Sequence, residues 1–101
     1  MLIRIVKMEF RKEEVDTFKA LFETVKFKII SQPGCQHLEL LQGTDTTTFF
    51  TYSYWDNQEA LDQYRHSDLF ETTWEKTKAL FNEAPQAWST SRLHHLDSNQ
   101  S

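Results

Sequence analysis

A chain of 101 residues is long enough for one domain with a single two-layer hydrophobic core. Hydrophobic residues make up 39% of the chain and aromatic residues 14%, which is typical of a folded globular protein that buries many aromatic rings. The net charge is -4, and 11 basic residues are scattered among 15 acidic ones. The chain therefore has no basic patch of the kind that binds nucleic acid.

The single cysteine, Cys35, excludes an internal disulfide and any zinc or redox site built from paired cysteines. We interpret it as a small buried residue at the start of a strand. The first ten residues are too short and too charged for a signal peptide, and no apolar run approaches the roughly 18 residues of a membrane span. We therefore expect a cytoplasmic protein with no membrane partner.

The first part of the chain predicts a strand followed by an amphipathic helix. Residues 2–10 are mostly apolar or β-branched, with Arg4 and Lys7 between them, and indicate a strand. Apolar side chains then recur at the spacings of one helix face, at Val15, Phe18, Phe22, Val25 and Ile29. Pro33 and Gly34 end this helix.

The next two segments predict a hairpin. Residues 35–42 form its first strand, residues 43–46 the turn, and residues 47–55 a second strand rich in aromatic side chains. Because strand side chains alternate, the second strand presents two faces, one with Phe49, Thr51 and Trp55 and the other with Phe50, Tyr52 and Tyr54. Neither face suits bulk water, so we expect both to be covered.

The second half of the chain predicts two helices and a last strand. Asp56 and Glu59 fit a capping box that begins a short helix over residues 57–66, which Ser67 and Asp68 break or cap anew. A longer helix that stops before Pro85 is predicted from helical spacings of Phe70, Trp74, Thr77 and Phe81. Residues 88–93 predict the last strand, and residues 94–101 a polar tail.

This order of elements predicts an α+β fold of the ferredoxin-like, split βαβ type. Right-handed crossovers place both helices on one face of a four-stranded antiparallel sheet and leave the other face bare. A large apolar sheet face is rare on a soluble monomer, so we expect a homodimer that forms through the sheet faces. The alternative is a monomer whose outer sheet face is exposed to solvent.

The layout resembles the antibiotic biosynthesis monooxygenase domain of the dimeric α/β-barrel superfamily. The resemblance covers residues 1–93 and is carried by four short segments, which are Pro33-Gly34-Cys35, Tyr52-Ser53-Tyr54-Trp55, residues 57–61 and Ser67-Asp68-Leu69-Phe70. It implies a homodimer whose two sheets close a barrel, with a ligand cavity between sheet and helices in each subunit. The superfamily also includes haem-degrading enzymes, quinol monooxygenases, isomerases and members with no known substrate.

The resemblance also implies where a ligand would bind. In members that oxygenate polycyclic phenols without a cofactor, the cavity is lined by the strand-end tryptophan and by an asparagine four residues before it. This chain keeps the tryptophan as Trp55 and has Thr51 in place of the asparagine. Haem-degrading members carry an iron-ligating histidine at the position of Trp74, which cannot ligate iron. We therefore expect no haem, metal or flavin cofactor.

Oxygenation without a cofactor requires binding of a flat ring and help in removing a proton. The candidate ring-binding residues are Phe49, Trp55, Tyr64, Phe70 and Trp74, and Thr51 is a further candidate for substrate binding. Each aromatic one is also explained as core packing. As a base, His37 is the best placed histidine, because histidine is the side chain most often used for proton transfer at neutral pH. The alternative for His37 is a hydrogen-bonded residue at the dimer face.

Two function classes remain after these steps. The first is a cofactor-independent monooxygenase that acts on a quinol or another electron-rich aromatic, with His37 and Trp55 as its catalytic residues. The second is a non-catalytic dimeric domain that binds a small ligand or has a regulatory role. Hydrolase, metalloprotease and nucleotide-dependent motifs are absent from the sequence, whose only glycines are Gly34 and Gly43.

Overall fold

The centre of the fold is an antiparallel sheet whose strands lie in the order β2-β3-β1-β4. The computed structural model describes residues 1–98. In chain order the strands are β1 (Leu2–Phe10), β2 (Cys35–Gln42), β3 (Thr48–Trp55) and β4 (Phe81–Ser91). The predicted hairpin forms, with β2 and β3 joined by the turn at residues 43–47. The two central strands, β3 and β1, have a partner on each side.

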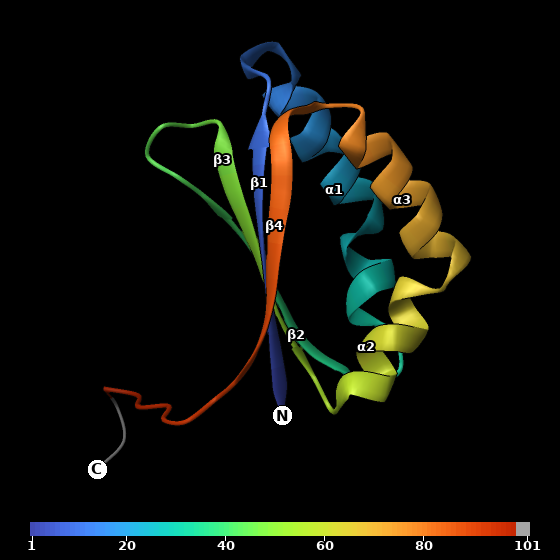
Figure 1. Ribbon diagram of the computed structural model, residues 1–101, viewed down its shortest axis with the longest axis vertical. Coiled ribbons are helices and arrows are strands. Elements are labelled where there is room, and N and C mark those ends of the chain that lie inside the picture. The colour runs from blue at the N-terminus through green and yellow to red at the C-terminus, as the bar shows by residue number, and fades with distance from the viewer. Residues whose placement is uncertain (99–101) are drawn as a thin grey trace.

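The helices cover a single face of this sheet, as Figure 1 shows. They are α1 (Val15–Ile30), α2 (Gln58–Arg65) and α3 (Asp68–Lys78), and a short 3-10 helix, η1 (Lys12–Glu14), precedes α1. No helix among residues 1–98 lies on the other face. The predicted ferredoxin-like α+β fold is therefore confirmed. None of these helices is long and apolar enough to cross a membrane.

Most of the buried core side chains form two separate clusters between sheet and helices. In the first, Phe10 stacks on Phe18 of α1 with ring centroids 4.1 Å apart, and Phe49 meets Phe18 edge-on at 5.3 Å. In the second, Trp55 packs with Cys35 and Leu61. Cys35 is buried at the first position of β2, as predicted. The hydrophobic packing is thus concentrated at two places along β3 rather than spread evenly over the sheet.

The N-terminal cap of α2 differs from the prediction. The residue that caps the helix is Asn57, whose side-chain Oδ1 accepts a hydrogen bond from the Ala60 backbone N–H at 2.9 Å. Asp56 instead accepts a hydrogen bond from the Gln36 side chain at 2.9 Å and thereby joins the helix start to β2. Ser67 caps α3 through the Phe70 N–H, at 3.2 Å, so the predicted break between two helices is confirmed.

The boundary between α3 and β4 is the largest error of the sequence analysis. The helix ends at Lys78 and does not include Phe81, which begins the last strand and pairs with Phe10 of β1. The strand is therefore Phe81–Ser91 and not residues 88–93. It contains Pro85, which has no backbone N–H to donate. An edge strand tolerates a proline because one side of the strand faces solvent and needs no hydrogen-bond partner. The register between β1 and β4 shifts near this proline, between Lys7 and Phe10.

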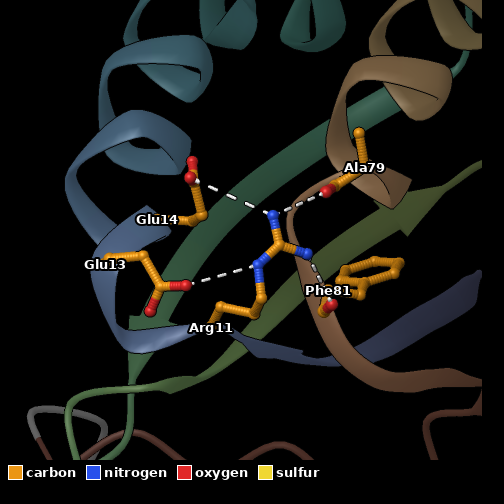
Figure 2. A network of polar contacts seen from close by, with 5 residues as sticks. All are labelled: Arg11, Glu13, Glu14, Ala79 and Phe81. Atoms are coloured by element: carbon orange, nitrogen blue, oxygen red, sulfur yellow. Dashed lines mark hydrogen bonds and ion pairs between the residues drawn. The ribbon is translucent and has the colours of Figure 1, made fainter.

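Arg11 fixes the turn between α3 and β4. Its guanidinium donates hydrogen bonds to the backbone carbonyl oxygens of Ala79, at 3.0 Å, and Phe81, at 3.2 Å. On its other side it lies 3.5 Å from a carboxylate oxygen of Glu13 and 4.0 Å from one of Glu14 (Figure 2). Cations are favourable at the C-terminal end of a helix, where carbonyl groups lack intrahelical partners. This contact joins the end of β1 to the end of α3.

Residues 92–98 follow β4 without helix or strand, and residues 99–101 of the predicted tail lie outside the described residues. Leu93 and Leu96 in this segment are both exposed. In Figure 1 the segment leaves the end of β4 on the side of the sheet opposite the helices. The predicted domain boundary at residue 93 stays a prediction.

We expect Gly34→Ala to lower the free energy of unfolding by about 2–4 kcal/mol. Gly34 has a φ angle of +83°, and an added Cβ would lie 2.5 Å from the Ala60 Cβ in the first turn of α2. Urea unfolding measures the change. The double variant Gly34→Ala/Ala60→Gly, compared with Ala60→Gly alone, removes the steric contact and should leave only the backbone strain, about 1–2 kcal/mol. Unchanged stability of Gly34→Ala would contradict the expectation.

Candidate functional site

A cavity of about 440 Å³ lies between the sheet and the three helices. Its walls include Met8 and Phe18 from the first core cluster and Trp55 and Leu61 from the second, so the cavity occupies the space between the two clusters. A volume of this size is in the range that holds a small organic ligand. The cavity is therefore the candidate functional site.

One wall of the cavity is a row of aromatic rings in mutual contact. The Trp55 indole stacks on the Tyr64 ring with centroids 5.1 Å apart, and Tyr64 meets Phe70 edge-on at 5.2 Å. Phe70 in turn stacks on Trp74 at 5.8 Å. All four residues line the cavity. Such a wall favours a flat aromatic ligand, because rings gain stacked and edge-to-face contacts in addition to buried area.

Trp55 belongs to both the core and the cavity wall. Its side chain is only 1% exposed, and its indole N–H donates a hydrogen bond of 2.9 Å to the Ser53 hydroxyl on the same face of β3. This bond fixes the plane of the ring, because the single N–H donor of the indole has to point toward Ser53. The indole N–H is therefore already occupied, and a ligand would contact the face or edge of the ring.

Two groups that could act as a nucleophile or base keep their protons. Burial raises the pKa of the Tyr64 hydroxyl well above its usual range, and the neighbouring Cys35 adds to the effect. Burial also raises the pKa of the Cys35 thiol, although a backbone hydrogen bond with His37 opposes this. At neutral pH both groups are protonated, so Tyr64 can donate a hydrogen bond to a ligand but cannot accept its proton.

The open end of the cavity lies at β4 and carries positive charge. Arg4 lies opposite Ser89 in the pairing of β1 with β4, and its Nη1 donates a hydrogen bond of 2.9 Å to the Ser89 hydroxyl. Ser89 and Ala87 are exposed even though they share the helix-facing side with Arg4 and Val6, so this edge is not covered. Arg65, the last residue of α2, also lines the cavity.

Most of the predicted substrate-binding residues lie around this one cavity. Thr51, Trp55, Tyr64, Phe70 and Trp74 all line the cavity. Phe49 does not, because its ring is fully buried in the first core cluster between Phe10 and Phe18.

His37 lies on the opposite face of the sheet from the cavity. Its ring stacks on Tyr54 with centroids 4.4 Å apart, and its Nε2 lies 2.7 Å from a carboxylate oxygen of Glu39. The register between β2 and β3 shifts between Cys35 and His37, so that Cys35 is opposite Trp55 while His37 is opposite Tyr54. This irregularity reverses the face of the residues that follow it. A histidine in this position cannot reach a ligand in the cavity of its own chain.

The sequence analysis missed both arginines. A charged residue inside an apolar strand indicates a special environment, and Arg4 is such a residue, but it was interpreted only as part of the strand pattern. Arg65 has no signal of its own in the sequence, because a basic residue near the end of a helix is common. Among residues 1–98 no group of three or more histidine, cysteine, aspartate or glutamate side chains is placed to hold a metal ion.

Comparison with known proteins gives one family. The family model for antibiotic biosynthesis monooxygenases matches residues 1–76 of the chain. No curated protein matches the sequence. Residues 1–76 include β1, β2, β3 and most of the cavity wall, and they end inside α3.

Solved structures with the same fold cover nearly the whole chain. A crystal structure of an antibiotic biosynthesis monooxygenase has a TM-score of 0.87 at 18% identity and covers 93% of this chain and 100% of its own. A conserved protein from Methanosarcina mazei has a TM-score of 0.83 at 20% identity, covering 89% of this chain and 91% of its own. SnoaB, a cofactor-independent oxygenase from Streptomyces nogalater, has a TM-score of 0.84 at 14% identity, covering 94% and 95%. At these identities the similarity shows the fold alone.

We expect Trp55→Phe to lower both stability and affinity for flat aromatic ligands. The smaller ring leaves a void and removes the donor to Ser53, which should lower the free energy of unfolding by about 1–3 kcal/mol. Urea unfolding measures this, and calorimetric titration with 2-naphthalenemethanol measures binding. Ser53→Ala serves as the matched control, because it removes the hydrogen bond but keeps the indole. A loss of stability with unchanged binding would make Trp55 a packing residue only.

Proposed function

The chain belongs to the antibiotic biosynthesis monooxygenase family, and we propose that it is a cofactor-independent monooxygenase that acts on a quinol or another electron-rich aromatic. The observation that carries this proposal is the wall formed by Trp55, Tyr64, Phe70 and Trp74 along a cavity of about 440 Å³. This wall fits a flat ring and presents few polar groups, which suits chemistry that must exclude water.

The proposed reaction needs no external reductant. A hydroquinone that has lost a hydroxyl proton can pass an electron to dioxygen, and the two radicals then combine at a ring carbon. The O–O bond breaks next, so that one oxygen atom stays on the ring and the other leaves as water. For a hydroquinone the products are a hydroxyquinone and one water molecule, and the substrate supplies all the electrons. The protein has to bind the ring, favour its anion and exclude solvent.

Thr51 is the proposed contact for a substrate oxygen on the sheet side of the cavity. It lines the cavity on the same strand as Ser53 and Trp55. By resemblance, it occupies the position of an asparagine that lines the cavity in oxygenases of polycyclic phenols. A hydroxyl on a shorter side chain offers one donor in place of an amide group, so we expect a substrate different from that of those oxygenases.

A second candidate function is the binding of a small aromatic ligand without catalysis. The position of His37 on the far side of the sheet favours it, since no histidine of residues 1–98 then lines the cavity. The protonated Tyr64 and Cys35 do not replace that base. The two functions share the cavity and the ligand class, and they differ only in whether dioxygen is consumed.

We expect the purified protein to consume oxygen with reduced quinones in a buffer free of metal and flavin. The product should carry one atom of oxygen from labelled dioxygen, and Trp74→Leu, which removes part of the aromatic wall, should lower kcat/KM at least about tenfold. An oxygen electrode and mass spectrometry measure these results. Autoxidation of the quinol in buffer is the control. Tight binding of a quinol with no uptake above autoxidation would favour the second candidate.

We further propose that the protein is a homodimer joined through the outer sheet face. The side chains of Tyr52, Tyr54 and Trp88 project from this outer face. Trp88 is 46% exposed, and Leu41 is 47% exposed. No element among residues 1–98 covers them. An uncovered sheet face with several large apolar side chains is the usual sign of an interface.

We expect light scattering to give twice the chain mass of 12.0 kDa. Trp88→Glu should produce a monomer, because it places an unpaired charge within the proposed interface. Phe27→Glu is the matched control, since Phe27 is 72% exposed on α1, away from the outer sheet face. A wild-type monomer at micromolar concentration would contradict the proposal.

A further inference from the structure

The cavity is lined by two charged side chains among the described residues, and both are arginines. Arg4 comes from β1 and Arg65 from α2, so the sheet and the helix layer each contribute one positive charge. Carboxylate side chains are absent from the part of the cavity wall that residues 1–98 form. A cavity whose other described lining residues are uncharged thus carries a net positive charge.

This charge is poorly compensated within the protein. Neither Arg4 nor Arg65 has a carboxylate within 4.0 Å among residues 1–98. The carboxylate of Asp62 acts on the charge of Arg4, and one oxygen of that carboxylate already accepts a hydrogen bond of 2.9 Å from the Gln58 side chain. Burial lowers the pKa of Arg4 below its ordinary value, and the like charge of Arg65 adds to this while Asp62 opposes it.

Arg4 also has unused hydrogen-bonding capacity. A guanidinium has five N–H donors and remains protonated in proteins. Among residues 1–98, the guanidinium of Arg4 makes a single hydrogen bond, from Nη1 to the Ser89 hydroxyl. The other donors are free to meet a ligand. In the pairing of β1 with β3, Arg4 lies opposite Ser53, whose hydroxyl holds the Trp55 indole. The guanidinium itself points to the β4 side, and it lines the same cavity as the aromatic wall.

We propose that Arg4, assisted by Arg65, forms an oxyanion-binding end of the cavity, so that the aromatic ligand is bound as an anion. The ligand chemistry is an oxygen anion attached directly to a ring system, either an ionised phenol or a carboxylate substituent. Its ring lies along Trp55 and Tyr64, and its charged oxygen lies at the β4 edge beside the guanidinium of Arg4.

The proposal rests on the proposed function in taking the cavity as the substrate site, and it supplies the step that this function lacks. A phenol that binds beside a guanidinium loses its proton more readily, because the cation stabilises the anion. The O–H bond breaks, the electron pair stays on the phenol oxygen, and the proton leaves to water at the open edge of the cavity. Arg4 stabilises the anion and water accepts the proton, so the step needs no catalytic base such as His37.

The test compares ligands of equal shape and different charge. 1-Naphthoate and 1-naphthamide differ by the charge of one group, and neither is a phenol that dioxygen can oxidise. Calorimetric titration should show naphthoate binding at least about tenfold more tightly, the usual strength of a charge-assisted hydrogen bond. 4-Nitrophenol tests the phenol source, because its bound anion has its own absorption band. Its pKa should fall by about one unit on binding.

The variants identify the group responsible. Arg4→Gln should reduce the naphthoate preference to within about twofold of equality and abolish the nitrophenol shift. Arg65→Gln lies at an exposed helix end, where folding is not at risk. It should partly reduce both the naphthoate preference and the nitrophenol shift. Arg92→Gln is the matched control, since Arg92 lies over the Tyr54 ring on the outer face, 4.6 Å from its centroid, and should change neither.

The outcomes separate this proposal from the proposed function. A charge preference in either arm that disappears in Arg4→Gln supports the proposal even if no oxygen is consumed, and the arm that responds identifies the source of the anion. Equal binding of naphthoate and naphthamide with an unshifted nitrophenol would overturn it even if quinols are oxygenated. A preference that persists in Arg4→Gln, or a failure of all three probes to bind at millimolar concentration, would also overturn it.

Discussion

The alternation of side chains along β3 determines both faces of this molecule. On the helix side, β3 places Phe49 at one end and Trp55 at the other, and both are almost fully buried. Between them lie the smaller Thr51 and Ser53, which line the cavity. The two large rings fill the space at the ends of the strand, each with its own core cluster. The small residues between them leave a space that no side chain of the described chain fills.

The same alternation places the other aromatic residues of β3 on the outer face of the sheet. Tyr52 and Tyr54 point away from the helices, where their rings meet edge-on at 5.5 Å. Tyr54 also lies between the His37 ring and the Arg92 guanidinium. These contacts arrange the outer face but do not cover it. One strand therefore provides both a binding surface for a small molecule and a surface suited to a second copy of the chain.

The fold could be predicted from the sequence because its periodicities are strong, and the errors have local physical causes. Phe81 continues the helical spacing of Phe70, Trp74 and Thr77, yet it belongs to β4, because its ring packs on Phe10 at 5.2 Å and its backbone pairs with β1. Helical spacing alone could not show that a tertiary contact would end the helix earlier. Asp56 and Asn57 are both good capping residues, and only the contact of Asp56 with Gln36 decides between them.

The aromatic part of the candidate site could be predicted, whereas its polar part could not. Trp55 ends a strand and Tyr64 lies near the end of α2, while Phe70 and Trp74 share one face of α3 at helical spacing, so these rings converge in a small domain. His37 lies on the outer face because the register between β2 and β3 shifts after Cys35, and this position agrees with its alternative interpretation as a hydrogen-bonded residue of that face rather than as a base. Arg4 was missed because burial of its guanidinium depends on the helices packed above β1. Charge at a cavity edge is a property of the assembled fold and has no local sequence pattern.

The position of the cavity links ligand binding to the stability of the fold. Its walls come from both core clusters, so a bound ring would connect side chains that do not otherwise touch across the cavity. A ligand that binds only the folded chain stabilises it, by about 2.7 kcal/mol at a concentration one hundred times its Kd. That gain is a large fraction of the stability expected for a domain of this size. The unfilled space between Phe49 and Trp55 therefore has a cost in the free protein that a flat aromatic ligand would remove. The Arg4 guanidinium is only partly buried, so its desolvation adds a smaller cost, which an anionic ligand would offset.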